Sequence, residues 1–165
     1  MKFLSIKEYF YKLNTIGFIL LLLPLVVFIF LYYLSVKNEA MMPDQQSVII
    51  LLVITSSIFF IDLTIVHWVW KLKIARLRNL IELAKKMDGF FPLAVLKMAA
   101  YCFGSLLMAA GFFLSESHLF TAAFIAITMT IGFQWPSPSF FCNSLDLRGN
   151  ERAMIMEAQD MEKKK

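Results

Sequence analysis

Residues 47–70 read SVIILLVITSSIFFIDLTIVHWVW, an apolar run that contains a single formally charged side chain. An α-helix needs about twenty such residues to cross the hydrocarbon core of a bilayer. Three further apolar runs of similar length occupy residues 15–34, 92–114 and 118–135. None of the four shows the period-two alternation of a barrel strand, so the sequence predicts an all-α fold, a four-helix transmembrane bundle.

The composition also favours a membrane protein. Hydrophobic residues make up 59% of the 165 positions, whereas soluble domains are about 45–50% apolar. We expect one four-span domain at residues 15–135, a cytoplasmic segment at residues 1–14 and a cytoplasmic tail at residues 136–165. The net charge of +4 is concentrated beside the spans, which favours anionic lipid headgroups over nucleic acid as partners.

The charges between the runs predict the orientation in the membrane. The first connection holds Lys37 with Glu39 and Asp44, and the third has no basic residue. The second connection is strongly basic and contains Lys71, Lys73, Arg76, Arg78, Lys85 and Lys86. Because Lys and Arg accumulate on the cytoplasmic side, both termini and this connection should face the cytoplasm, in a plasma or bacterial inner membrane.

The second connection, residues 71–91, has a helical pattern of its own. Apolar residues recur with the spacing of an amphipathic helix at Leu77, Leu80, Ile81, Ala84 and Met87. We expect a bend near Trp70 and an in-plane amphipathic helix at residues 71–87, ended by Asp88 and Gly89, with Pro92 in the first turn of the next helix. The alternative is a tall cytosolic hairpin in which the third helix starts early. In the in-plane form, the basic residues that contact lipid headgroups are Lys71, Lys73, Arg76 and Arg78.

The chain after the fourth run contains two candidate helix starts. Pro136 ends the span, Ser137 is placed to cap a short helix that begins at Pro138, and Asn150 is placed to cap a second helix. A frayed, solvated tail is favoured over an arm that binds a partner or lipid, because the apolar stripe is short.

Two ionisable residues lie inside predicted spans. Asp62 is the only acidic one, and antiparallel packing of the second and third helices would place Lys97 at a similar depth. An intramembrane carboxylate is a functional-site candidate by default, here for ion or solute translocation with Lys97 as charge partner. Two structural interpretations are favoured over it: a pair that only fixes the helices, or a protonated Asp62 with Lys97 extending to the headgroups.

Small residues mark expected helix-packing faces. They form one stripe on each of the last two spans: Ala100, Gly104 and Gly111 on the third, and Ala122, Ala126 and Thr130 on the fourth. Such stripes let two backbones approach closely. We expect the two helices to pack on each other as a hairpin; a seam for a homo-oligomer or a larger membrane complex is the alternative.

No motif in the chain carries identifiable chemistry. Catalytic signatures are absent, Cys102 and Cys142 lack paired spacing, and His67 and His118 fall near opposite ends of their spans. We therefore expect no enzyme activity, no metal site and no cofactor. The leading interpretation is a non-enzymatic accessory or assembly subunit, and the alternative is a small translocating protein that uses Asp62.

Overall fold

The computed structural model describes residues 5–37 and 44–163, and the side chains of all of these except 36 and 158–163. Lys2 and Glu39, two of the charged residues on either side of the first apolar run, lie outside the described residues. The regular elements in the described ranges are all helical: α1 (Ile6–Lys37), α2 (Gln45–Arg78), α3 (Leu83–Ser115), α4 (His118–Phe133), α5 (Pro138–Ser144) and α6 (Asn150–Lys163). The predicted all-α class is confirmed.

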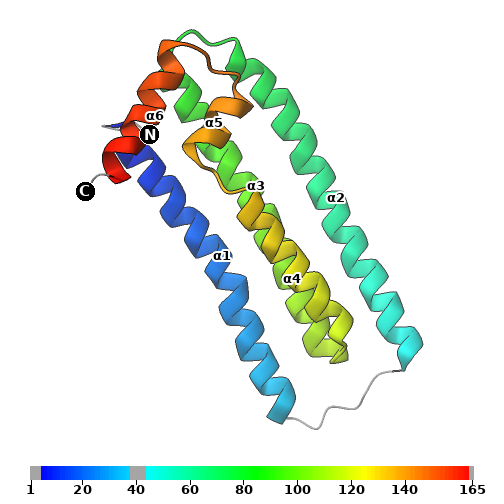
Figure 1. Ribbon diagram of the computed structural model, residues 1–165. Coiled ribbons are helices and arrows are strands. Elements are labelled where there is room, and N and C mark those ends of the chain that lie inside the picture. Colours follow the sequence, from blue (N-terminus) through cyan, green and yellow to red (C-terminus); the bar gives the residue numbers. More distant parts are fainter. Residues whose placement is uncertain (1–4, 38–43, 164–165) are drawn as a thin grey trace.

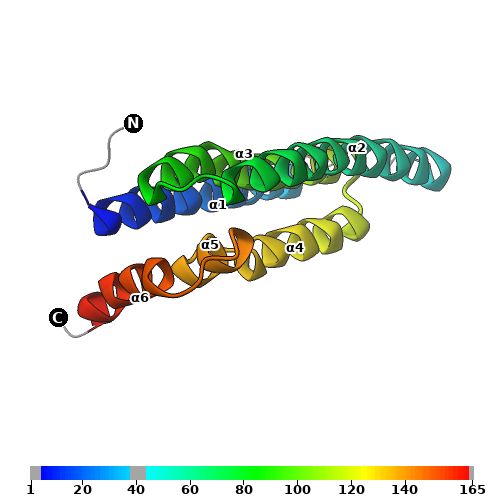
Figure 2. The same ribbon diagram turned by 90° about the horizontal axis from the view of Figure 1, so that it is seen from above.

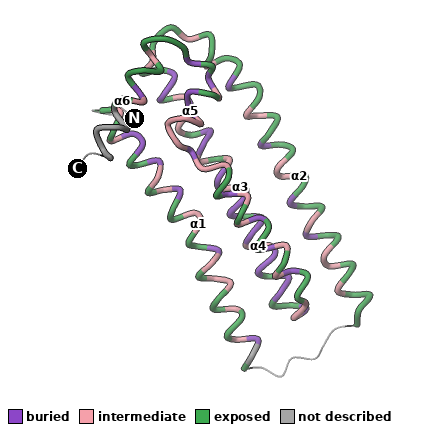
Figure 3. The backbone as a smooth tube through the Cα atoms, viewed as in Figure 1, coloured by how far each residue is buried: buried purple, intermediate pink, exposed green. Residues whose placement is uncertain are grey.

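The helices form two layers around α3. Figure 1 shows α3 between α1 and α2, and Figure 2 shows these three in one layer with α4, α5 and α6 in the other. α3 packs against α1, α2 and α4. The buried residues are accordingly concentrated on α3, whereas α1 and α2 expose most of their outer faces (Figure 3). α3 is the central helix of the fold.

Three of the described helices, α1, α2 and α3, are long and apolar enough to cross a membrane. Each contains more than 30 residues, which corresponds to roughly 50 Å at 1.5 Å per residue and exceeds a hydrocarbon core of about 30 Å. α4 has only 16 residues, and it passes the same test only together with α5, to which it is bent by 80°. The chain therefore has the helices of a membrane protein.

The second connection differs from the sequence prediction. No separate in-plane helix forms at residues 71–87; α2 continues to Arg78, a short turn follows, and α3 begins at Leu83. Residues 83–91 return the chain as helix, so α2 has no need to bend at Trp70. The structure thus has the tall hairpin that was the less favoured alternative.

Packing explains why Asp88 and Gly89 do not end a helix. A Cβ atom at Gly89 would collide with the side chain of Leu77, so this glycine allows the ends of α2 and α3 to approach closely. Pro92 lies inside α3 and removes the backbone hydrogen bond to residue 88. The Asp88-Gly89 pattern is typical of a helix end, but in this structure it lies where α2 and α3 pack closely together.

The C-terminal chain also differs from expectation. Ser137 does cap α5, where its Oγ accepts a hydrogen bond of 3.1 Å from the Phe140 amide. The chain is not a frayed tail, however, because α5 and α6 pack back onto the starts of α1 and α3 and the end of α2. We call this cluster the terminal core; its buried members are Tyr9, Phe10, Leu13, Ile74, Met87, Phe90, Leu93, Ala94, Met98, Phe141, Cys142, Leu145, Leu147 and Ile155.

Candidate functional site

An open groove of about 570 Å³ lies between α2, α3 and the turn that joins α4 to α5. We call it the Lys97 groove. It is lined by Phe60, Leu63, Thr64, Val66, His67, Trp70, Lys97, Tyr101, Gln134 and Phe140. Most of these side chains are apolar or aromatic, and Lys97 is the only formal charge among them.

Helix geometry and the break between helices α4 and α5 assemble the groove. Phe60, Leu63 and His67 share one face of α2 at i, i+3 and i+7, and Lys97 and Tyr101 are one turn apart on α3. The break at residues 134–137 then places Gln134 and Phe140 over the same region. Trp135 fixes this break to α1, since its Nε1 donates a 3.0 Å hydrogen bond to Asn14 Oδ1.

The Lys97 ammonium rests on aromatic rings. Its Nζ lies 4.9 Å from the centroid of the Trp70 ring and 5.3 Å from that of Phe140. Of the four ion pairs within the described residues, none includes Lys97. Ring contacts stabilise a cation by about 0.5–2 kcal/mol and leave its hydrogen-bond donors available.

Two further polar groups of the groove have unused hydrogen-bonding capacity. Gln134 Nε2 donates a 2.8 Å hydrogen bond to the Tyr101 hydroxyl. Gln134 Oε1 is buried and has no donor among the described residues, and the Tyr101 proton has no acceptor there. A buried polar atom without a hydrogen-bond partner costs about 1–3 kcal/mol. A ligand that supplied the missing partner would therefore bind more tightly.

Asp62 lies outside this groove. It is on α2 two residues from Phe60, which on a helix directs it to a different side, and it is absent from the lining. The structure places no ion pair between Asp62 and Lys97, so the expected pair is not formed. Asp62 Oδ2 is instead buried without a hydrogen-bond partner in the described chain.

The four residues predicted to contact headgroups are all exposed near the end of α2. Lys71, Lys73 and Arg76 point to the outside of the bundle. Arg78 is engaged as well, because its Nε and Nη2 donate hydrogen bonds of 3.0 and 2.8 Å to the Ser144 carbonyl. This contact joins α2 to the end of α5.

The small residues of α3 do mark close helix contacts. A Cβ atom at Gly104 would collide with Phe59 of α2, and one at Gly111 would collide with Phe120 of α4. Ala100 is 6% exposed. The α3 stripe therefore serves two neighbours rather than one.

The α4 stripe faces the other way, which corrects the expected hairpin seam. Ala122 and Ala126 are exposed and Thr130 is partly exposed. α4 instead buries large residues against α3, namely Phe120, Phe124, Ile127 and Ile131. The groove of α3 at Gly111 accepts the Phe120 ring, so the small residues of α4 are left free for other contacts.

The described residues contain no cluster of three or more His, Cys, Asp or Glu side chains that would hold a metal ion. Cys102 and Cys142 are free and buried. The sequence did not single out Trp70, Gln134 and Phe140 as groove residues. The Trp-Pro-Ser-Pro stretch at 135–138 marked a helix break, but which side chains the break brings together depends on tertiary packing.

A comparison with protein families, curated proteins and solved structures finds no match for this chain. The function is therefore argued from the chain's own residues.

Proposed function

We propose that the chain is a multi-pass integral membrane protein with four spans that serves as a non-enzymatic accessory or assembly subunit. The observation that carries the assembly role is the outward face of α4. Ala122, Ala126 and Thr130 form a shallow stripe that no other described helix covers. Small-residue stripes are a common contact surface between membrane helices.

The fourth span is built from α4 and the turn after it. A 16-residue helix rises about 24 Å, slightly less than a hydrocarbon core of about 30 Å. The remaining depth is covered by residues 134–137 and the start of α5. Trp135 would then lie at the membrane interface, where Trp is enriched.

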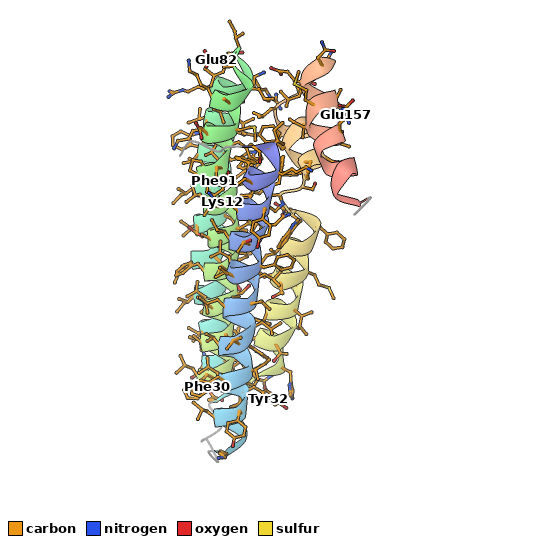
Figure 4. All side chains as sticks on the ribbon, turned by 90° about the vertical axis from the view of Figure 1, so that its left-hand side faces the viewer. Lys12, Phe30, Tyr32, Glu82, Phe91 and Glu157 are labelled. Carbon is orange, nitrogen blue, oxygen red and sulfur yellow. The ribbon has the colours of Figure 1, made fainter. Side chains whose placement is uncertain are left out.

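The distribution of charge supports a cytoplasmic location for both termini. The starts of α1 and α3, the end of α2, and α5 and α6 all lie at one end of the molecule (Figure 1). Lys12, Glu82 and Glu157 mark this end in Figure 4, and the aromatic residues Phe30 and Tyr32 mark the opposite end. Most basic residues are at the first end, which the positive-inside rule assigns to the cytoplasm.

Cysteine labelling tests this orientation. Cysteines replace Glu82 in the turn after α2 and Ser117 in the turn after α3, in a background where Cys102 and Cys142 are changed to Ala. A membrane-impermeant thiol reagent applied from outside should label position 117 alone. Labelling of position 82 from outside would refute the orientation.

Cross-linking tests the assembly role. Ala122→Cys and Ala126→Cys variants, with Cys102 and Cys142 changed to Ala, are labelled in native membranes with a thiol-attached photo-crosslinker, and the cross-linked products are identified by mass spectrometry. We expect a discrete product, either a second copy or another membrane protein. Val53→Cys on the exposed face of α2 is the control. Absence of any α4 product, together with a monomer in mild-detergent pull-downs, would refute the subunit role.

A second candidate function is translocation through Asp62. The supporting observation is the buried, unpartnered Asp62 Oδ2, since an intramembrane carboxylate without a structural partner is expensive to keep. If Asp62 moves ions or protons, Asp62→Asn should abolish flux in reconstituted vesicles and leave the protein folded. Equal flux in both proteins, or none in the wild type, would exclude this function.

A further inference from the structure

The Lys97 groove has a polar end and an apolar end. Lys97, Trp70 and Gln134 lie at the end nearer the terminal core, and Leu63 and Phe60 lie at the other. From Trp70 to Phe60 the wall of α2 extends about 15 Å at 1.5 Å per residue. This length equals half of a hydrocarbon core of about 30 Å, which is the depth of one leaflet.

The groove opens toward apolar surroundings. Phe60, at its apolar end, is 65% exposed, and Leu63 and Trp70 of the lining are partly exposed. Exposed apolar side chains in the lining indicate contact with lipid rather than water. An occupant would therefore enter sideways from the bilayer.

The polar end is suited to an anion. Lys97 has three N–H donors and no carboxylate partner in the described chain, and its ammonium lies over the Trp70 and Phe140 rings. The Tyr101 O–H lies in the same groove without an acceptor. A phosphate oxygen accepts from both kinds of donor, and hydrogen bonds between charged groups are about twice as strong as neutral ones.

We propose that the Lys97 groove binds one anionic phospholipid of the adjoining leaflet, with the phosphate on Lys97 and part of an acyl chain along Leu63 and Phe60. The volume of about 570 Å³ accommodates the phosphate and the upper part of one chain, while the rest of the lipid stays in the bilayer. The inference rests on the membrane location proposed above and is independent of the accessory role.

Native mass spectrometry of the full-length chain in mild detergent tests this site. The protein is titrated with phosphatidylglycerol and, separately, with phosphatidylcholine, and the affinity for the first bound lipid is measured. We expect wild type to prefer phosphatidylglycerol, and Lys97→Met to lower its affinity for that lipid about tenfold, as for the loss of one charged hydrogen bond. Lys97→Arg should retain the preference, which separates loss of charge from misfolding.

Two further variants locate the lipid. Lys7→Met removes an exposed charge outside the groove and should leave the first binding event unchanged. Leu63→Trp fills the apolar end and should weaken both lipids. Equal wild-type affinity for the two lipids, or an unchanged affinity in Lys97→Met, would overturn the proposal.

A photo-crosslinking residue at position 63 distinguishes the occupants in native membranes. A phospholipid adduct is the expected result. A protein adduct in place of the lipid would show that the groove holds a partner helix and would overturn the lipid site. Reversed labelling of positions 82 and 117 would affect only the orientation, because the phospholipid would then come from the other leaflet.

Discussion

The terminal core is stabilised differently from the span region, by which we mean α4 and the parts of α1, α2 and α3 that lie beyond the terminal core. In the terminal core, five helices enclose side chains on all sides, so that Tyr9, Phe90, Phe141 and Ile155 are each 0% exposed. In the span region, α1 and α2 touch α3 along one face and leave the other open. The terminal core is packed like a water-soluble domain, whereas the apolar outer faces of α1 and α2 are left uncovered by the described part of the chain.

Aromatic rings pack on the inner side of both regions, as the Phe28 and Phe124 rings do in the span region at 4.4 Å, so the contrast lies on the outer faces of the spans. The Phe90 ring lies 5.5 Å from Trp70 and 4.8 Å from Phe141, both in edge-on geometry. Outward-facing residues of the spans, such as Val26 at 62% and Ile61 at 60% exposure, contact nothing of comparable density. Mutations should therefore have large effects in the terminal core and smaller effects on the outer faces of α1 and α2.

The largest expected effect is that of Phe90→Ala. Removing a fully buried ring leaves a cavity, and the free energy of unfolding should fall by about 3–5 kcal/mol. Phe30→Ala, which removes a 60% exposed ring from α1, is the matched control and should cost less than about 1 kcal/mol. Thermal unfolding in mild detergent measures both. Similar losses for the two variants would remove the distinction between the regions.

The ion pair between α3 and α6 gives the next largest effect. Lys86 Nζ lies 2.8 Å from Glu151 Oε2, and the Lys86 side chain is only 8% exposed. Glu151→Gln leaves that ammonium without its charged partner and should lower stability by about 2 kcal/mol. Adding Lys86→Met should recover most of the loss, because the unpaired charge is then removed.

The exposed pair between Lys85 and Glu82 is the control for that measurement. Its two side chains are 64% and 62% exposed, so Glu82→Gln should change stability by at most about 0.5 kcal/mol. If Glu151→Gln is equally mild, α6 is not held by this pair. The contact of α6 with the terminal core would then depend mainly on apolar side chains such as Ile155.

A third prediction concerns close helix contact within the span region. Gly104→Ala forces a Cβ atom against Phe59, so we expect a loss of about 1–3 kcal/mol in thermal unfolding. Gly132→Ala on α4 meets nothing within 4 Å and should gain up to about 1 kcal/mol from helix propensity. Equal effects would mean that α2 is free to shift away from α3.

The sequence predicted the parts of this structure that depend on local pattern. The apolar runs identified the helices, and Ser137 with Pro138 identified the start of α5. The pattern at Asp88 and Gly89 misled, because the signal for a helix stop is the same as the signal for close packing against Leu77. Local sequence does not distinguish a glycine that ends a helix from one that lets another helix approach.

The site was predictable only in part, for a similar reason. Lys97 was singled out because a charge in an apolar run is unusual, and it is the charged residue of the groove. Its ring partners come from α2 and from α5, which the 80° bend after α4 brings into place. The direction of the α4 stripe was also set by tertiary packing, since α3 accepts Phe120 at Gly111.

The smallest expected effect is the coupling between Asp62 and Lys97, and it tests whether charge organises the span region as it does the terminal core. Asp62 Oδ2 has no hydrogen-bond partner within the described chain, and Lys97 rests on Trp70 and Phe140. Because no ion pair or hydrogen bond joins the two residues, the stability changes of Asp62→Asn and Lys97→Met should add within about 0.5 kcal/mol in the double variant. Thermal unfolding of wild type, both single variants and the double variant completes the cycle.

A direct ion pair, like that of Lys86 and Glu151, would instead show rescue. Removing the second charge would then recover the stability that was lost when the first charge was left without its partner. Rescue by more than about 1 kcal/mol would therefore establish a direct interaction between the two and join them into one site. Additive changes would mean that Asp62 does not hold α2 to α3. A carboxylate without that structural role would be the right one to test for translocation.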